Sequence, residues 1–190
     1  TSRVITVVLL VSAVILTIAA SIFENKFGQI LDARISDSID ATTEIIEQKM
    51  LSIEKATCTL AKLISADVDS RRDIDSTLCR ALKGMGDDIT AVSIVLEKGY
   101  LPGIRGPYER IAYYDRTRKL LMSEYTEEDE IEEDPGWKEC YGAGISGWSD
   151  PNESIVDGLS FISFYTPVHD RSGRRIGLVY SAILTDRLTS

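Results

Sequence analysis

The chain has 190 residues, 44% of them hydrophobic and 27% charged, with a formal net charge of −9 at pH 7. This length suits one folded domain with a core of its own. Acidic residues outnumber basic ones 30 to 21 and no basic stretch occurs, which argues against nucleic acid as a partner. The single histidine, His169, argues against a catalytic triad or a histidine-rich zinc site.

The first notable segment is Val4–Phe23, which contains no charged residue, no proline and no glycine. A helix of about twenty residues is about 30 Å long, the thickness of the hydrocarbon layer of a membrane. The sequence therefore predicts a transmembrane helix. Arg3 precedes it, which favours a cytoplasmic N-terminus and an extracytoplasmic module at the inner membrane. The alternative is a cleaved signal peptide ending near Ala19–Ser21, and it exports the module as well.

Residues 24–68 show the pattern of one long helix. Apolar residues recur at spacings of three and four from Phe27 to Ile64, without a proline. The stripe is denser over Ile45–Ile64, which predicts packing on the following module. Its thinner first half predicts a stalk that pairs with a second copy in a homodimer. The alternative is that the whole stripe belongs to the core.

Residues 69–188 form the predicted module. Helical spacing, β-branched residues and turn residues predict two short helices and five strands. The expected fold class is α+β, with an antiparallel sheet of roughly five strands flanked by helices. The predicted helices are Asp73–Leu82 and Asp134–Tyr141; the predicted strands are Ile89–Glu97, Tyr108–Asp115, Lys119–Tyr125, a part of Ile155–Val168, and Arg175–Leu184, with a hairpin turn at His169–Arg174.

The last sixty residues resemble the extracytoplasmic Cache family, the PAS-like sensor domains of bacterial transmembrane receptors. The resemblance rests on an ordered set of short motifs rather than on one. These are Trp137, Gly147, Trp148–Pro151 (WSDP), Tyr165–Val168 (YTPV), Asp170–Gly173 and Ile176–Val179 (IGLV). The predicted anchor and the long first helix agree with the same architecture.

The resemblance implies a signal-input domain that binds a small ligand and passes a conformational change to a cytoplasmic output domain. It implies no catalysis by this part of the protein, although a kinase, phosphatase or cyclase could follow it. The sequence departs from members that bind amino acids, which carry an arginine just before the helix tryptophan. Asp134–Gly136 stands there instead, and Asn152–Ser154 replaces a Tyr-x-Asp motif. The alternative function is a membrane-anchored dimerisation or protein-interaction module that binds no ligand.

Candidate ligand contacts are aromatic residues of the module and two charged residues beside them. Aromatic side chains often line ligand pockets, although they pack in cores more often. We expect no catalytic residue, metal or cofactor. The candidates are Arg110, Tyr114, Trp137, Tyr141, Trp148, Asp150 and Tyr165.

Three further patterns leave alternatives open. Cys58 and Cys79 form either a disulfide or two free thiols, and Cys140 has no obvious partner. The run Glu124–Asp134 holds eight acidic residues and is interpreted as a solvated loop, with cation binding as the alternative. Gly142–Gly147 matches G-x-G-x-x-G but does not follow a strand, so a turn is predicted.

Overall fold

The computed structural model describes the backbone of residues 2–67, 71–125, 131, 136–153 and 159–188. Side chains are described for residue 26 and for 33–65, 73–125, 131, 136–153 and 159–188. The chain divides into two units, residues 1–45 and 46–190. The second unit holds the sheet and the candidate ligand-binding site.

One helix, α1 (Ser2–Asp67), confirms the predicted long helix over residues 24–67, and residue 68 lies outside the described residues. The first unit consists of its N-terminal part, where the side chains of Ile35 and Ile39 are 50% and 59% exposed. The predicted membrane segment Val4–Phe23 lies within α1, but its side chains are outside the described residues. Among the residues that the structure describes, no helix has the length and apolar character needed to cross a membrane.

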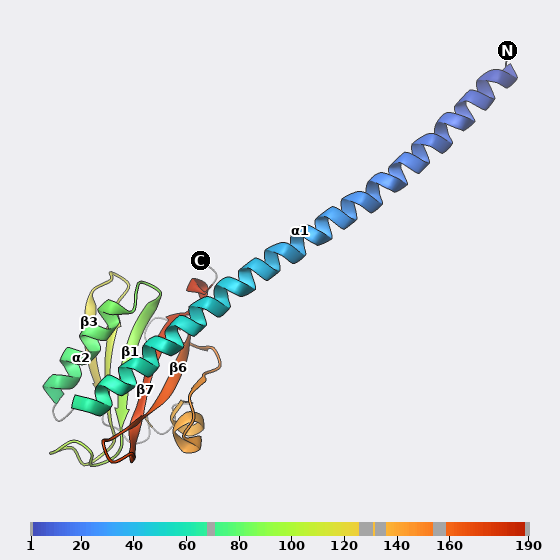
Figure 1. The fold of residues 1–190 in the computed structure, drawn as a ribbon. Coiled ribbons are helices and arrows are strands. Elements are labelled where there is room, and N and C mark those ends of the chain that lie inside the picture. Colours follow the sequence, from blue (N-terminus) through green and yellow to red (C-terminus); the bar gives the residue numbers. More distant parts are fainter. Residues whose placement is uncertain (1, 68–70, 126–130, 132–135, 154–158, 189–190) are drawn as a thin grey trace. The chain divides into compact units, whose positions relative to one another are not determined.

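In the second unit, the C-terminal part of α1 and the helix α2 (Arg71–Gly84) pack on the same face of the sheet (Figure 1). We call this the helix face. α1 buries Ile53, Leu60 and Ile64 there, each at most 4% exposed, as the dense half of its stripe predicted. Burial of one such side chain is worth about 1.5–3 kcal/mol. α2 contributes its own stripe to this core, namely Ile74, Leu78 and Leu82.

The sheet is antiparallel and has seven strands in the order β3-β2-β1-β7-β6-β4, with β5 also paired to β6. The five predicted strands are present. The prediction of about five strands was too low because β4 and β5 have two residues each, too few to show a period of two. The strands are β1 (Ile89–Leu96), β2 (Tyr108–Tyr114), β3 (Leu120–Tyr125), β4 (Gly147–Trp148), β5 (Asn152–Glu153), β6 (Ser160–His169) and β7 (Arg175–Leu184).

The predicted turn between β6 and β7 is organised by Asp170. Its carboxylate accepts hydrogen bonds from the backbone N–H groups of Ser172 (2.9 Å) and Arg174 (3.0 Å), and from the Ser172 hydroxyl (2.6 Å). These bonds favour the charged carboxylate and lower the pKa of Asp170 to about 2, with the Ser172 side chain as the main cause. Gly173 has a φ of +83°, which is why glycine suits that position.

Of the two alternatives left open for Cys58 and Cys79, the structure has free thiols, and Cys140 is free as well. Cys58 on α1 contacts Thr166 on β6 at 3.5 Å, and Cys79 on α2 contacts Met122 on β3 at 3.5 Å. The two thiols therefore face different strands. Of the acidic run, residues 126–130 and 132–134 lie outside the described residues.

Candidate ligand-binding site

The second face of the sheet, opposite α1 and α2, holds a separate group of side chains. Successive residues of a strand point to opposite faces, so Ser93, Tyr165 and Tyr180 point away from the helix face. Strand register places them in one row, with Tyr180 of β7 paired to Tyr165 of β6 on one side and to Ser93 of β1 on the other. We call this the η1 face, after the short helix that covers it.

The helix η1 (Trp137–Tyr141) covers part of this face and has π-helical geometry. Trp137 and Tyr141 stack with ring centroids 4.1 Å apart at an interplanar angle of 11°. The ring of Tyr165 packs against that of Tyr180 at 5.0 Å. The resulting small core is completed by Val95, Ile131, Cys140 and Leu178, all at most 6% exposed.

Gly136 lets η1 approach the sheet closely. A Cβ atom at this position would lie 2.0 Å from Cε1 of Tyr165. The backbone of Gly136 is ordinary right-handed helix, with φ −65° and ψ −36°, so the requirement for glycine comes from space alone. The position directly before Trp137 therefore has no room for a side chain, the arginine of amino-acid receptors included.

Polar groups lie beside this aromatic core. The carboxylate of Glu109 on β2 accepts hydrogen bonds from the hydroxyls of Tyr180 (2.7 Å) and Ser93 (3.0 Å). Ser163 on β6 points to the same face and is fully buried, and its hydroxyl oxygen has no partner among the described residues. A buried hydroxyl without a partner is costly, and a bound ligand is one way to satisfy it.

A cation lies at one end of the same face. The guanidinium of Arg175, the first residue of β7, is 4.4 Å from the centre of the Tyr141 ring. It also lies against the turn that follows η1, because a Cβ at Gly144 would be 2.6 Å from its Nη1. The φ of Gly144 is +70°, in agreement with the turn predicted for Gly142–Gly147.

The structure brings three of the seven predicted contacts together: Trp137, Tyr141 and Tyr165. Arg110 lies on the helix face, where its Nε and Nη2 donate to the carboxylate of Asp75 on α2 at 2.6 and 2.9 Å. The hydrogen bond to Asp75 raises the pKa of Arg110 further.

Tyr114 and Trp148 also lie on the helix face. Tyr114 packs against the helix-face core, with the guanidinium of Arg118 4.9 Å from its ring centre. Trp148 donates from Nε1 to Glu54 of α1 at 2.8 Å and packs on Phe164. Asp150 is exposed. As ligand contacts, Arg110 and these three residues stay predictions.

The sequence reasoning missed the polar part of the η1 face, namely Ser93, Glu109, Ser163, Arg175 and Tyr180. The signal available in the sequence was the alternation of side chains between the two faces of a strand. Glu109 precedes Arg110 in β2, so the two side chains must point to opposite faces of the sheet. Which of the two faces carries the aromatic residues depends on the position of η1, which periodicity does not give.

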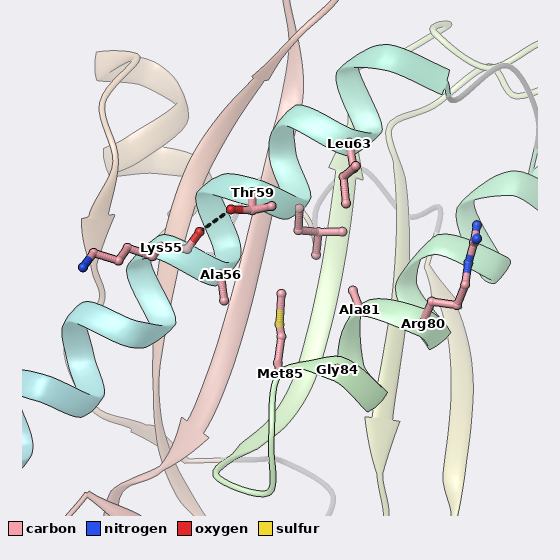
Figure 2. Close-up of a pocket in the computed structure, with 9 residues that line it drawn as sticks. Lys55, Ala56, Thr59, Leu63, Arg80, Ala81, Gly84 and Met85 are labelled. Atoms are coloured by element: carbon pink, nitrogen blue, oxygen red, sulfur yellow. Dashed lines mark hydrogen bonds between the residues drawn. The ribbon is translucent and has the colours of Figure 1, made fainter.

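A hollow with a volume of about 340 Å³ lies between α1 and α2. Figure 2 shows Lys55 and Arg80 extending away from its centre, toward which Met85 points. The lining is mostly apolar, and its polar side chains do not converge on the centre of the hollow. The lining residues are Lys55, Ala56, Thr59, Leu60, Leu63, Arg80, Ala81, Gly84 and Met85. It is a weaker candidate for a specific ligand than the η1 face.

The described residues contain no group of three or more His, Cys, Asp or Glu side chains that could hold a metal ion. The groups that the described residues place on the η1 face are aromatic rings, hydroxyls, the Glu109 carboxylate and the Arg175 guanidinium.

No protein-family model and no curated protein matches the sequence. Solved structures do match. The extracellular domain of soHK1S-Z6, a protein described as a histidine kinase, has a TM-score of 0.65 at 12% identity and covers 83% of this chain. The ligand-binding domain of the Campylobacter jejuni chemoreceptor Tlp3, in complex with 4-methylisoleucine, has a TM-score of 0.61 at 14% identity and covers 80%.

The ligand-binding domain of the Pseudomonas aeruginosa amino-acid chemoreceptor PctC, in complex with GABA, has a TM-score of 0.52 at 12% identity and covers 81% of the chain. These matches cover 63%, 57% and 61% of the respective known structures, so the chain spans about three fifths of their length. The fold expected from the Cache resemblance is confirmed: the chain has the fold of the extracytoplasmic sensory domains of histidine kinases and chemoreceptors.

Proposed function

We propose that the chain is the ligand-binding input domain of an extracytoplasmic signalling receptor, with its small-molecule site on the η1 face. The observation that carries this proposal is the combination of aromatic rings and partly or fully buried polar side chains on the η1 face. Trp137, Tyr141 and Tyr165 supply apolar surface, and Glu109 with Ser163 supplies polar groups for orientation. Pockets for small ligands have this composition.

The same proposal places Val4–Phe23 across the cytoplasmic membrane, with the module on its extracytoplasmic side and a signalling output in the cytoplasm. Support comes from the apolar sequence of that segment and from the fold shared with receptor domains. Protein lacking residues 1–23 should leave the membrane fraction. Retention in that fraction would contradict the anchor.

A thermal-shift screen tests the ligand site. The full chain, purified in detergent, would be melted with small carboxylates, amines and divalent cations, and unfolding would be followed by tryptophan fluorescence. A ligand at 100 times its dissociation constant adds about 2.7 kcal/mol of stability. Glu109→Gln should weaken the response, whereas Glu139→Gln, on the exposed side of η1, should not. If no compound stabilises the protein, the ligand-binding proposal fails.

A second candidate function is dimerisation through the N-terminal part of α1. Ile35 and Ile39, four residues apart on one face of the helix, are 50% and 59% exposed. Exposed branched side chains at this spacing are typical of a helix that pairs with another helix. Sedimentation should show a dimer that the double variant Ile35→Asn/Ile39→Asn weakens and Ser36→Asn preserves. A monomer at high concentration would contradict this candidate.

A further inference from the structure

The geometry of the η1 face points to Arg175 as the residue that recognises an anionic group of the ligand. This inference rests on the proposed function and adds a chemical class to it: a small molecule bearing a carboxylate or another compact oxyanion.

Arg175 carries a charge that no described carboxylate balances. Arginine side chains in proteins stay protonated, and a partly buried guanidinium usually pairs with an acid. Within the described residues, the Nε atom of Arg175 is buried and has no hydrogen-bond partner. The neighbouring Arg174 differs, since its Nε donates to the carboxylate of Asp170 at 3.2 Å. A buried donor without a partner is expensive unless something binds to it.

The surroundings hold the guanidinium in one place. The ring of Tyr141 lies 4.4 Å below it and is itself stacked on Trp137, so two rings support one cation. The backbone of Gly144 closes a further side. A guanidinium fixed in this way presents its planar fork with little loss of entropy on binding, which suits a carboxylate or a phosphate.

The position of the Arg175 guanidinium bears on the missing arginine before Trp137, where the sequence departs from the pattern of amino-acid receptors. Gly136, directly before Trp137, has no room for a side chain because the Tyr165 ring fills that space. Arg175 approaches η1 from β7 instead, and its guanidinium lies over Tyr141 at the other end of that helix. The η1 face therefore has a positive group, although not where the sequence pattern of amino-acid receptors has one.

The inference also gives the ligand a polarity. Arg175 marks the end of the site that binds the anionic group, and the hydroxyls of Tyr180 and Ser93 with the Glu109 carboxylate mark a second polar region of the same face. The ring of Tyr141 lies beside the first of these groups and the ring of Tyr165 beside the second. A compact molecule with an oxyanion at one end and an apolar middle satisfies these groups.

The test is a titration of the full chain in detergent with acetate, propionate, succinate and inorganic phosphate at constant ionic strength. Trp137 reports on the site, and the Trp148→Phe background removes the only other tryptophan. Arg175→Gln should weaken anion binding about 10- to 100-fold, the range expected for a charge-assisted hydrogen bond. Arg175→Lys should retain part of the affinity, because it keeps the charge and loses the planar fork.

Arg174→Gln is the matched control, since it removes the same charge from the neighbouring residue, which is exposed and bonded to Asp170. Affinity for the anion should change less than twofold in this variant. If Arg175→Gln and Arg174→Gln lowered the affinity for the anion equally, the change in net charge alone would explain the loss, and the inference would be overturned. Binding of an amine or a neutral compound, with no anion bound, would overturn the role of Arg175 and leave the ligand site standing. If nothing binds at all, both proposals fail.

Discussion

Replacing Gly136 with alanine tests how closely η1 packs on the sheet. The helical backbone at this position suits alanine, which by itself would stabilise the protein by about 0.4–1 kcal/mol through the unfolded state. The new Cβ, however, would lie 2.0 Å from the Tyr165 ring, and this ring is 2% exposed and packed against Tyr180. Overpacking of a buried site costs about 1–3 kcal/mol.

We therefore expect Gly136→Ala to lower the free energy of unfolding by about 1–2 kcal/mol. The melting temperature should fall by about 2–8 °C. Urea unfolding followed by tryptophan fluorescence measures the change. The control is Gly142→Ala at the other end of η1, which also has helical backbone angles but no atom within 4 Å of the new Cβ. That variant should be more stable than the wild type by about 0.4–1 kcal/mol.

The reasoning would be refuted if both glycine variants shifted stability in the same direction. A double variant sharpens the result. With Tyr165→Ala in the background, the collision partner is gone, so Gly136→Ala should cost little beyond the loss already caused by the smaller side chain. A cost that persists in this background would mean that Gly136 is constrained by something other than the ring.

Three further predictions concern groups away from η1. In a titration, the carboxyl of Asp170 should have a midpoint near 2, so the stability it confers is present above about pH 4 and lost as the pH falls toward 2; a midpoint near 4 would contradict the turn geometry. Asp75→Asn should destabilise the protein by about 0.5–1.5 kcal/mol in urea unfolding, because it breaks the partly exposed, two-pronged bond with Arg110; an unchanged midpoint would refute this. Alkylation of the denatured, unreduced protein should modify both Cys58 and Cys79, and a mass 2 Da lower with neither modified would show a disulfide.

Long elements could be predicted from the sequence because each carries several periods of its own pattern. The stripe of α1 and the β-branched runs of β1, β6 and β7 are of this kind. The two-residue strands β4 and β5 carry no such pattern, since they exist only through pairing with β6. The state of Cys58 and Cys79 stayed open because proximity in sequence says nothing about which strands two helices face.

The candidate site was harder to predict because it depends on which face of the sheet each strand residue points to. A shift by one residue moves a strand side chain to the other face, so Arg110 and Glu109 belong to different surroundings. The aromatic residues of η1 could be found because their motif stands out in the sequence. Arg175 could not, because its role depends on the position of Tyr141, 34 residues earlier in the chain.

The segment that follows η1 also contacts α1. Trp148 bonds to Glu54, and Ser146 bonds to Thr166, which in turn contacts Cys58. One short stretch of chain thus links the η1 face to the helix on the opposite side of the sheet. If a ligand moves this stretch, thermodynamic linkage makes the effect mutual: whatever holds α1 in one position must change the ligand's affinity by the same factor by which the ligand favours that position. The ligand's affinity for the isolated module should then differ from its affinity for a receptor in which α1 is held in place. The ratio of the two affinities is the coupling factor between the ligand site and α1.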